Sequence, residues 1–343
     1  MEIKPEEVKA FMLSSGLWPF IKQRPVDVVA DPKNEPKAIF VSAFDSSPLA
    51  PDYDFIVHGN AEAFQVGLDV LQKLTSGKVH LTLNTKGSSD EAFKNASGVQ
   101  INKISGKHPA GNVGTQIHHI DPINKGEFVW VLNPQDVLNI GKSCVAGHFD
   151  ASKYVAISGA EVKKPVYLKT VIGASMKTLL NDGLNSDNAR IISGNALCGT
   201  NVGEDGYLGF YDSHVTALPE GNDAKFFLTS GWLGLGGSDK FSNSKAYLSF
   251  LAPSKKRNLD TNLNGEERGF VVTGEMEKVF PFDIFPMHLI KSVMYNDIDQ
   301  MEQLGIYEIA PEDFALCEFV CTSKVEIQDV IRKGLDVIQE ECL

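Results

Sequence analysis

The residues best suited to chemistry lie in one stretch, HPAGNVGTQIHHIDP, at positions 108–122. Two adjacent imidazoles, His118 and His119, stand beside the carboxylate of Asp121, a combination that can bind a metal ion or relay a proton. In extended backbone, however, adjacent side chains point to opposite sides, and no HExxH-like pattern supplies a third ligand. We therefore expect a structured loop whose histidines are hydrogen-bonded to the backbone, and no metal site.

The same stretch has two glycines, Gly111 and Gly114, which permit positive φ. It follows a predicted strand, so it would lie at the carboxyl edge of the sheet, where open α/β sheets bind ligands. The candidates for contact with a ligand or a partner are therefore His108, Gly111, Gly114, His118, His119 and Asp121.

Phosphate-binding chemistry is missing from the chain. A dinucleotide site needs G-x-G-x-x-G after the first strand, whereas residues 44–49 read FDSSPL, with no glycine and with Pro48 lacking an amide donor. The glycines of GWLGLGGSDK at 231–240 have the wrong spacing for a phosphate loop. No Ser/His/Asp or Cys/His arrangement stands out either, so we predict no catalytic and no cofactor-binding residue in this chain.

Cys317 and Cys321 are four residues apart, so their thiols face the same way on a helix. Two thiolates do not complete a zinc site or an iron–sulfur cluster, and Cys144, Cys198 and Cys342 do not cluster with them in the sequence. We predict buried, reduced cysteines.

The stretch FPFDIFPM at 280–287 places three phenylalanines and a methionine among prolines. Most such stretches belong to a core. If it is exposed, Phe282 and Phe285 would form a hydrophobic surface for docking a partner.

The elements that must position these residues alternate between strand and helix from residue 26 to residue 152. Apolar runs predict strands at 38–43, 78–83, 99–104 and 128–132, with helices after Asn60, at 90–96 and from Pro134. This order predicts a doubly wound α/β domain with a parallel sheet. A leading amphipathic helix at 5–21 precedes it, in a segment that we bound at 1–25.

From residue 153 the pattern changes to a hairpin, a helix starting at Ser175, and further strands. This order predicts a β-grasp domain over 153–221, followed by a mainly helical C-terminal domain over 222–343. The 343 residues carry a net charge of −12, of which −9 falls in residues 295–343. That charge argues against nucleic acid as a partner. The acidic segment is either a solvated helical face or an electrostatic docking face.

No apolar run reaches the ~18–20 residues of a membrane helix, and the N-terminus has no secretory signal. Five cysteines, an odd number, are not typical of a disulfide framework. A reduced, cytoplasmic environment fits this composition best.

The sequence resembles the family formed by the A subunits of sodium-translocating NADH:quinone oxidoreductases (Na+-NQR). The stretch at 108–122 is similar to that family's HPAG-x-x-GTHIH-x-x-DP motif, with Gln116 standing where the family more often has histidine. Further similar stretches occur in family order at 14–18, 38–43, 190–194, 239–242, 253–255 and 316–321.

The resemblance implies a Rossmann-like core of the type found in the flavin-binding subunit of respiratory complex I, then an SLBB domain of the β-grasp class. It also implies a peripheral subunit on the cytoplasmic side of the bacterial inner membrane, in a six-subunit pump. That complex transfers electrons from NADH through flavins and iron–sulfur centres to quinone and exports sodium. The resemblance implies that the chain interacts with quinone and has no cofactor of its own, and it makes Cys317 and Cys321 a remnant of a cluster motif.

Members of the family have a barrel domain of about a hundred residues before the stretch at 14–18, so the resemblance implies a fragment lacking that domain. Two alternatives stay open. One is an NADH- or flavin-binding electron-entry subunit like the C subunit of the Rnf complex, which would need a glycine-rich loop and cluster cysteines. The other is a free-standing ligand-binding module that uses the β-grasp domain.

Overall fold

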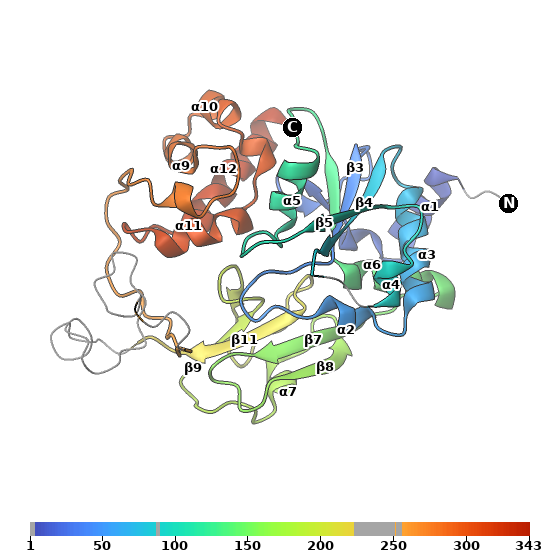
Figure 1. Cartoon of the computed structure of the whole chain (residues 1–343), viewed down its shortest axis with the longest axis horizontal. Helices are drawn as coiled ribbons and strands as arrows, with labels where there is room; N and C mark the ends of the chain where they lie inside the picture. Colours follow the sequence, from blue (N-terminus) through green and yellow to red (C-terminus); the bar gives the residue numbers. More distant parts are fainter. Residues whose placement is uncertain (1–3, 87–89, 223–250, 252–255) are drawn as a thin grey trace.

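The computed structural model describes residues 4–86, 90–222, 251 and 256–343. Figure 1 shows three units: an α/β unit, a small β unit beneath it, and a helical C-terminal unit beside it. The glycine-rich stretch at 231–240, whose spacing does not fit a phosphate loop, lies outside the described residues.

The larger sheet has the strand order β2-β1-β6-β3-β4-β5. Its parallel strands are β3 (Ala38–Ser42), β4 (Lys78–Asn84), β5 (Gln100–Ile104) and β6 (Val129–Leu132). The four predicted strands are therefore confirmed. The chain builds outward from β3 through β4 to β5 and then crosses to β6 on the other side of β3, so the strand order reverses between β3 and β6.

Helices cover both faces of this sheet, as the alternation along β3 requires. Ile39 and Val41 pack into the core that contains α3 (Ala61–Gln72) and α6 (Pro134–Ala146). Ala38 and Phe40 point to the opposite face and pack against α5 (Val113–Ile120). The short helices α2 (Tyr53–Val57) and α4 (Glu91–Lys94) complete the connections.

The helix α5 corrects the prediction of a loop at 108–122. Val113, Ile117 and Ile120 recur at helical spacing and pack on the sheet. Two neighbouring glycines obscured this pattern in the sequence. The predicted role of those glycines is also wrong, because Gly111 and Gly114 are not among the described residues with positive φ.

The leading segment also differs from the prediction. The helix α1 (Pro5–Ser14) ends where Gly16 takes a φ of 76°, and the 3-10 helix η1 (Trp18–Phe20) follows. Two short antiparallel strands that were not predicted come next, β1 (Lys22–Arg24) and β2 (Val28–Val29). Because β1 pairs with β6, this segment is part of the sheet.

The small β unit has the strand order β10-β9-β11-β7-β8. Its elements are β7 (Ser152–Ser158), β8 (Val166–Val171), α7 (Met176–Leu180), β9 (Ala189–Ser193), β10 (Thr200–Asn201) and β11 (His214–Pro219). The hairpin β7–β8 is antiparallel, whereas β11 returns parallel to β7. This is the predicted β-grasp arrangement, with α7 packed on the sheet through Met176, Leu179 and Leu180.

The C-terminal unit is mainly helical, as predicted. It contains η3 (Met276–Lys278), α9 (Pro286–Met294), α10 (Ile298–Gln303), η4 (Ile306–Glu308), η5 (Pro311–Phe314), α11 (Ala315–Val320) and α12 (Ile327–Cys342). Val26, in the β1–β2 turn, inserts into the core of this unit and is 1% exposed. It does so at a φ of 81°, which a β-branched residue rarely adopts, so local packing holds it there.

Candidate functional site

A cavity of about 200 Å³ lies at the carboxyl ends of β3 and β6, where the strand order reverses. Open α/β sheets bind ligands at such a point. All three units contribute side chains to its lining. The α/β unit contributes most of them, the β-grasp unit adds Asn195, Cys198 and Tyr211, and the C-terminal unit adds Glu312.

The loop after β3 forms one wall of the cavity. The Asp45 carboxylate accepts a hydrogen bond from the backbone N–H of Ser47 at 2.8 Å, which closes a tight turn. Ser46 Oγ accepts from the Gly111 N–H at 2.7 Å and lies 3.1 Å from His108 Nδ1. A Cβ on Gly111 would lie 2.3 Å from the Ser46 nitrogen, so glycine is required there for close backbone approach.

The start of α6 forms the opposite wall. Asn133 caps this helix by accepting from the Asp136 N–H at 3.0 Å, and its amide donates to the Asp136 carboxylate at 2.6 Å. Asp136 is 2% exposed, and burial raises its pKa to about 7. Lys153 is equally buried, but its ammonium group donates to the carbonyl of Phe210 rather than forming an ion pair with Asp136.

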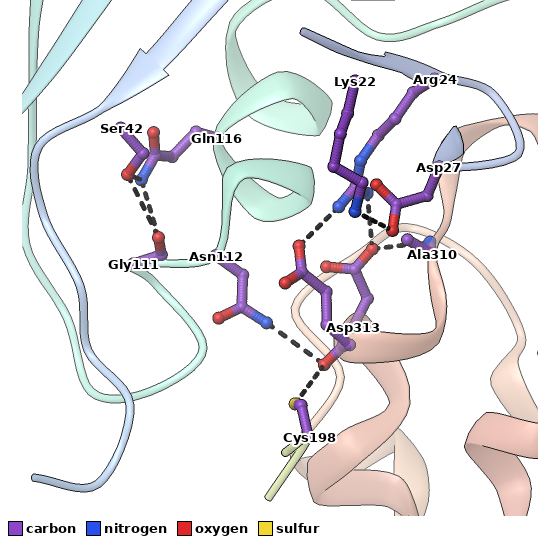
Figure 2. A network of polar contacts seen from close by, with 11 residues as sticks. Lys22, Arg24, Asp27, Ser42, Gly111, Asn112, Gln116, Cys198, Ala310 and Asp313 are labelled. Atoms are coloured by element: carbon purple, nitrogen blue, oxygen red, sulfur yellow. Dashed lines mark hydrogen bonds and ion pairs between the residues drawn. The ribbon is translucent and has the colours of Figure 1, made fainter. Parts of the chain in front are cut away.

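The C-terminal unit borders the cavity with Glu312, next to a network of polar contacts that joins this unit to the rest of the chain (Figure 2). Arg24, on β1, is 1% exposed and binds Glu312 at 2.5 Å and Asp313 at 2.9 Å. The Asn112 amide donates to the carbonyl of Glu312 at 3.2 Å, and the Cys198 thiol lies 4.0 Å from the same oxygen. One short segment therefore contacts both other units.

Carboxylates give this cavity a negative potential, which contributes to the raised pKa values of the tyrosines that line it. Burial raises the pKa of Tyr53 well above its usual value, with a further contribution from Asp45 and Asp136. Burial, with Asp136 and Asp27, raises the pKa of Tyr211 to about 12. A phosphate group would face this potential beside a β3 loop without glycine. The residues present therefore do not fit the phosphates of a flavin or a dinucleotide.

The predicted site residues of the 108–122 stretch make different contacts and do not form one site. Gly111 lines the cavity. Gly114 faces the ion pairs instead, where a Cβ would lie 2.5 Å from Arg24 Nη1 and from the Asp313 carboxylate. Asp121, directly after the C-terminal end of α5, binds Lys37 at 2.9 Å.

His118 bonds to a side chain, which corrects the expectation of backbone-satisfied histidines. Its Nδ1 lies 2.6 Å from the Glu308 carboxylate, and its Nε2 accepts from the Asp283 N–H at 3.1 Å. The neutral ring with its proton on Nδ1 satisfies both contacts. The ring of His119 lies against His118 edge-on, and this histidine pair forms no metal site with other described side chains.

The aromatic stretch at 280–287 divides between core and surface. Phe280 and Phe282 stack in the C-terminal core, and Phe282 also contacts His118. Phe282 is thus not a surface residue, contrary to its candidacy for docking, because its ring fills the junction between α5 and the C-terminal unit. Phe285 is 65% exposed at the start of α9.

The predicted burial is confirmed for Cys317 and Cys321, which are 0% and 3% exposed, and is wrong for Cys144, Cys198 and Cys342, which are only partly buried. Within the described part of the chain, no group of three or more potential ligands is arranged to hold a metal ion.

Comparison with known proteins decides the family. The family model described as "NqrA second alpha/beta domain" matches residues 3–149, and that described as "NQRA C-terminal domain" matches residues 154–204. The A subunit of the Na(+)-translocating NADH-quinone reductase from Photorhabdus laumondii is 38% identical over 341 residues, which are 99% of this chain and 75% of the relative. The chain belongs to the NqrA family, the A subunits of the Na(+)-translocating NADH-quinone reductases.

Other NqrA proteins give the same result, for example that of Pasteurella multocida at 37% identity with the same coverage. Among solved structures, an NAD+-reducing [NiFe]-hydrogenase in its H2-reduced state aligns with 98% of this chain and 61% of its own. Its TM-score is 0.48 and its sequence identity is 11%.

As an NqrA protein, this chain is one part of a translocase, a sodium pump, and the electron-entry alternative of the Rnf type is not supported. Among the described residues, no helix combines the length and the apolar character needed to cross a bilayer.

Sequence reasoning missed the residues that shape the cavity. Asp45 and Asp136 each follow a parallel strand, and this position after a strand could have identified them as site residues. Arg24 had no comparable signal, because its partners are almost 290 residues away.

Proposed function

We propose that this chain is a peripheral, cytoplasm-facing subunit of a six-subunit pump in the bacterial inner membrane, without a redox cofactor of its own. In this proposal it docks on the other subunits and contributes to the interaction of the complex with quinone. Flavins and iron–sulfur centres of the complex reside in other subunits.

One observation carries the cofactor-free proposal. The position at the strand-order reversal, which receives phosphates in nucleotide-binding relatives of this fold, presents Asp45 and Asp136. The loop after β3 has no glycine, and Pro48 removes an amide donor. The two buried cysteines, Cys317 and Cys321, lie in the core of the C-terminal unit, and among the described residues no third His, Cys, Asp or Glu is placed to hold a metal ion with them, which supports their origin as a cluster remnant.

Docking on other subunits is supported by exposed apolar side chains on α9. Phe285, Met294 and Tyr295 are 65%, 47% and 83% exposed, and His288 stacks edge-on against Phe285. We propose the exposed side chains at the two ends of α9, with Phe285 at its start and Met294 and Tyr295 at its end, as the docking face. His119, which is exposed, is the remaining partner-facing candidate of the 108–122 stretch, since His108, Gly111, Gly114, His118 and Asp121 are engaged within the chain.

The test is co-purification of the tagged chain with the membrane subunits of its own complex. Phe285→Asp should abolish recovery of those subunits, while Tyr207→Asp, a β-grasp surface change at the same 65% exposure, should leave it intact. Thermal unfolding checks that both variants are folded. Recovery unchanged in Phe285→Asp would overturn the docking face. Failure of the unmodified chain to recover any of those partners would favour the free-standing ligand-binding module.

A further inference from the structure

The cavity at the β3–β6 reversal is lined by residues from three units of the chain and is open to solvent, and the proposed function does not use it. Ligand sites occur preferentially at domain junctions and at strand-order reversals of α/β sheets. Its volume of about 200 Å³ corresponds to roughly seven water molecules at ~30 Å³ each, which is room for one small organic molecule.

The charges around the cavity are not balanced. Lys22 is committed to Asp27 at 2.7 Å, and Arg24 is committed to Glu312 and Asp313. Asp45 and Asp136 also line the cavity, and neither has an ion-pair partner within the described part of the chain. An anion would therefore be repelled here, whereas a cation would be attracted.

Aromatic rings supply the rest of the recognition surface. Phe20, Phe44, Tyr53 and Tyr211 line the cavity. The Tyr211 hydroxyl donates to the Pro19 carbonyl at 2.8 Å, which fixes that ring. Phe20 is held by stacking on Phe149 and by contact with the tilted ring of Phe210. Aromatic faces attract planar cations and stack on planar rings.

One further polar atom lacks a partner at this site. Ser47 Oγ, in the lining, is buried and has no hydrogen-bond partner among the described residues. A buried hydroxyl without a partner costs free energy, and a donor or acceptor on a bound molecule would satisfy it. This observation is independent of the carboxylates.

We propose that this cavity binds a small planar organic cation, its ring against the aromatic side chains and its charged nitrogen edge toward Asp45 and Asp136. The class comprises amidinium groups and protonated amino-heterocycles, whose paired N–H groups match a carboxylate. The cavity is thus a ligand site of this chain, separate from the docking face on α9.

The experiment compares three probes of nearly one shape and different charge: benzamidine (cationic), benzamide (neutral) and benzoate (anionic). Isothermal titration of the full chain at constant ionic strength and about pH 8.5, above the raised pKa of Asp136, should show saturable 1:1 binding of benzamidine. Benzamide should bind at least tenfold more weakly, and benzoate should not bind. Asp136→Asn and Asp45→Asn should each lower the benzamidine affinity at least tenfold, while the exposed Asp187→Asn should change it less than twofold.

Two results would overturn this inference. One is benzoate binding as well as benzamidine, which would show shape recognition without charge. The other is benzamidine binding that neither carboxamide variant weakens, which would place the cation elsewhere on this acidic chain. If Asp136→Asn lowers the thermal unfolding temperature, Asp45→Asn, in the more exposed turn, decides the question. Neither result bears on co-purification with the membrane subunits.

Discussion

Arg24 and Asp313 form an ion pair at 2.9 Å in which the side chains are 1% and 0% exposed. The arginine belongs to β1 of the α/β sheet and the aspartate to η5 of the helical unit. Asp313 also accepts from the Ala310 N–H at 2.8 Å, so the carboxylate is held from both sides. The placement of the C-terminal unit against the cavity depends on this pair.

Arg24→Met should lower the free energy of unfolding by about 3–5 kcal/mol, because it leaves the buried Asp313 carboxylate without its countercharge. The double variant Arg24→Met/Asp313→Asn should recover a large part of that loss. Guanidinium unfolding measures both. Lys333→Ala, which removes an exposed pair with Asp329, is the control and should cost less than about 1 kcal/mol. Additive losses in the double variant would contradict the pairing.

Gly114→Ala should destabilise the chain although it improves helix propensity by about 1 kcal/mol. The new Cβ would lie 2.5 Å from Arg24 Nη1 and the Asp313 carboxylate, and forcing that ion pair apart adds to an overpacking cost of about 1–3 kcal/mol. The matched control is Gly269→Ala, whose Cβ meets nothing within 4 Å. Equal thermal stability of the two variants would show that α5 is not packed tightly against the Arg24–Asp313 ion pair.

Asp136 should make stability depend on pH. Burial raises its pKa from 3.8 to about 7, so between these values the native chain holds a proton that the unfolded chain has released. The free energy of unfolding therefore falls as pH rises through this window. Asp136→Asn should gain on the order of 1–3 kcal/mol relative to the unmodified chain between pH 5 and pH 8.

The titration of buried histidines does not change the stability difference between Asp136→Asn and the unmodified chain. Burial lowers the pKa of His80, His108 and His214, which titrate with the opposite sign, but they are common to both proteins and cancel in the difference. Urea unfolding at several pH values supplies the data. A difference that stays constant with pH would show that Asp136 is ionised throughout.

Cys317 and Cys321 should resist alkylation by iodoacetamide in the native chain. They are 0% and 3% exposed, and burial raises the pKa of Cys317 above its usual value, which suppresses the reactive thiolate. Peptide mapping should find modification at the partly exposed Cys342 first, and at the buried pair only after unfolding. Rapid native labelling of the pair would indicate an open, ligand-ready arrangement.

The sequence predicted the regular parts of this fold because their signals are local. The strands at 38–42 and 129–132 are apolar runs, which is the sequence pattern typical of parallel strands buried on both faces. The helix α5 was missed because its apolar stripe of three residues is short and begins beside two glycines. Those glycines are required because residues distant in the sequence pack closely against them. The local sequence pattern carries no information about that packing.

The candidate site was less predictable, since its groups meet only in three dimensions. Part of the acidic segment at 295–343 forms contacts with basic side chains of this same chain. Glu302 binds Lys125 at 2.6 Å, Glu308 binds His118, and Asp313 binds Arg24. Each partner lies at least 170 residues away, beyond the reach of any spacing argument.

We propose that this NqrA protein has no redox cofactor of its own. Fluorescence titration of FMN and of NADH with the purified chain tests this proposal most directly. We expect that neither fluorescence changes in a saturable way, because Asp45 and Asp136 line the cavity at the strand-order reversal, where this fold class binds phosphates. Stoichiometric quenching of FMN, or retention of FMN through gel filtration, would contradict it.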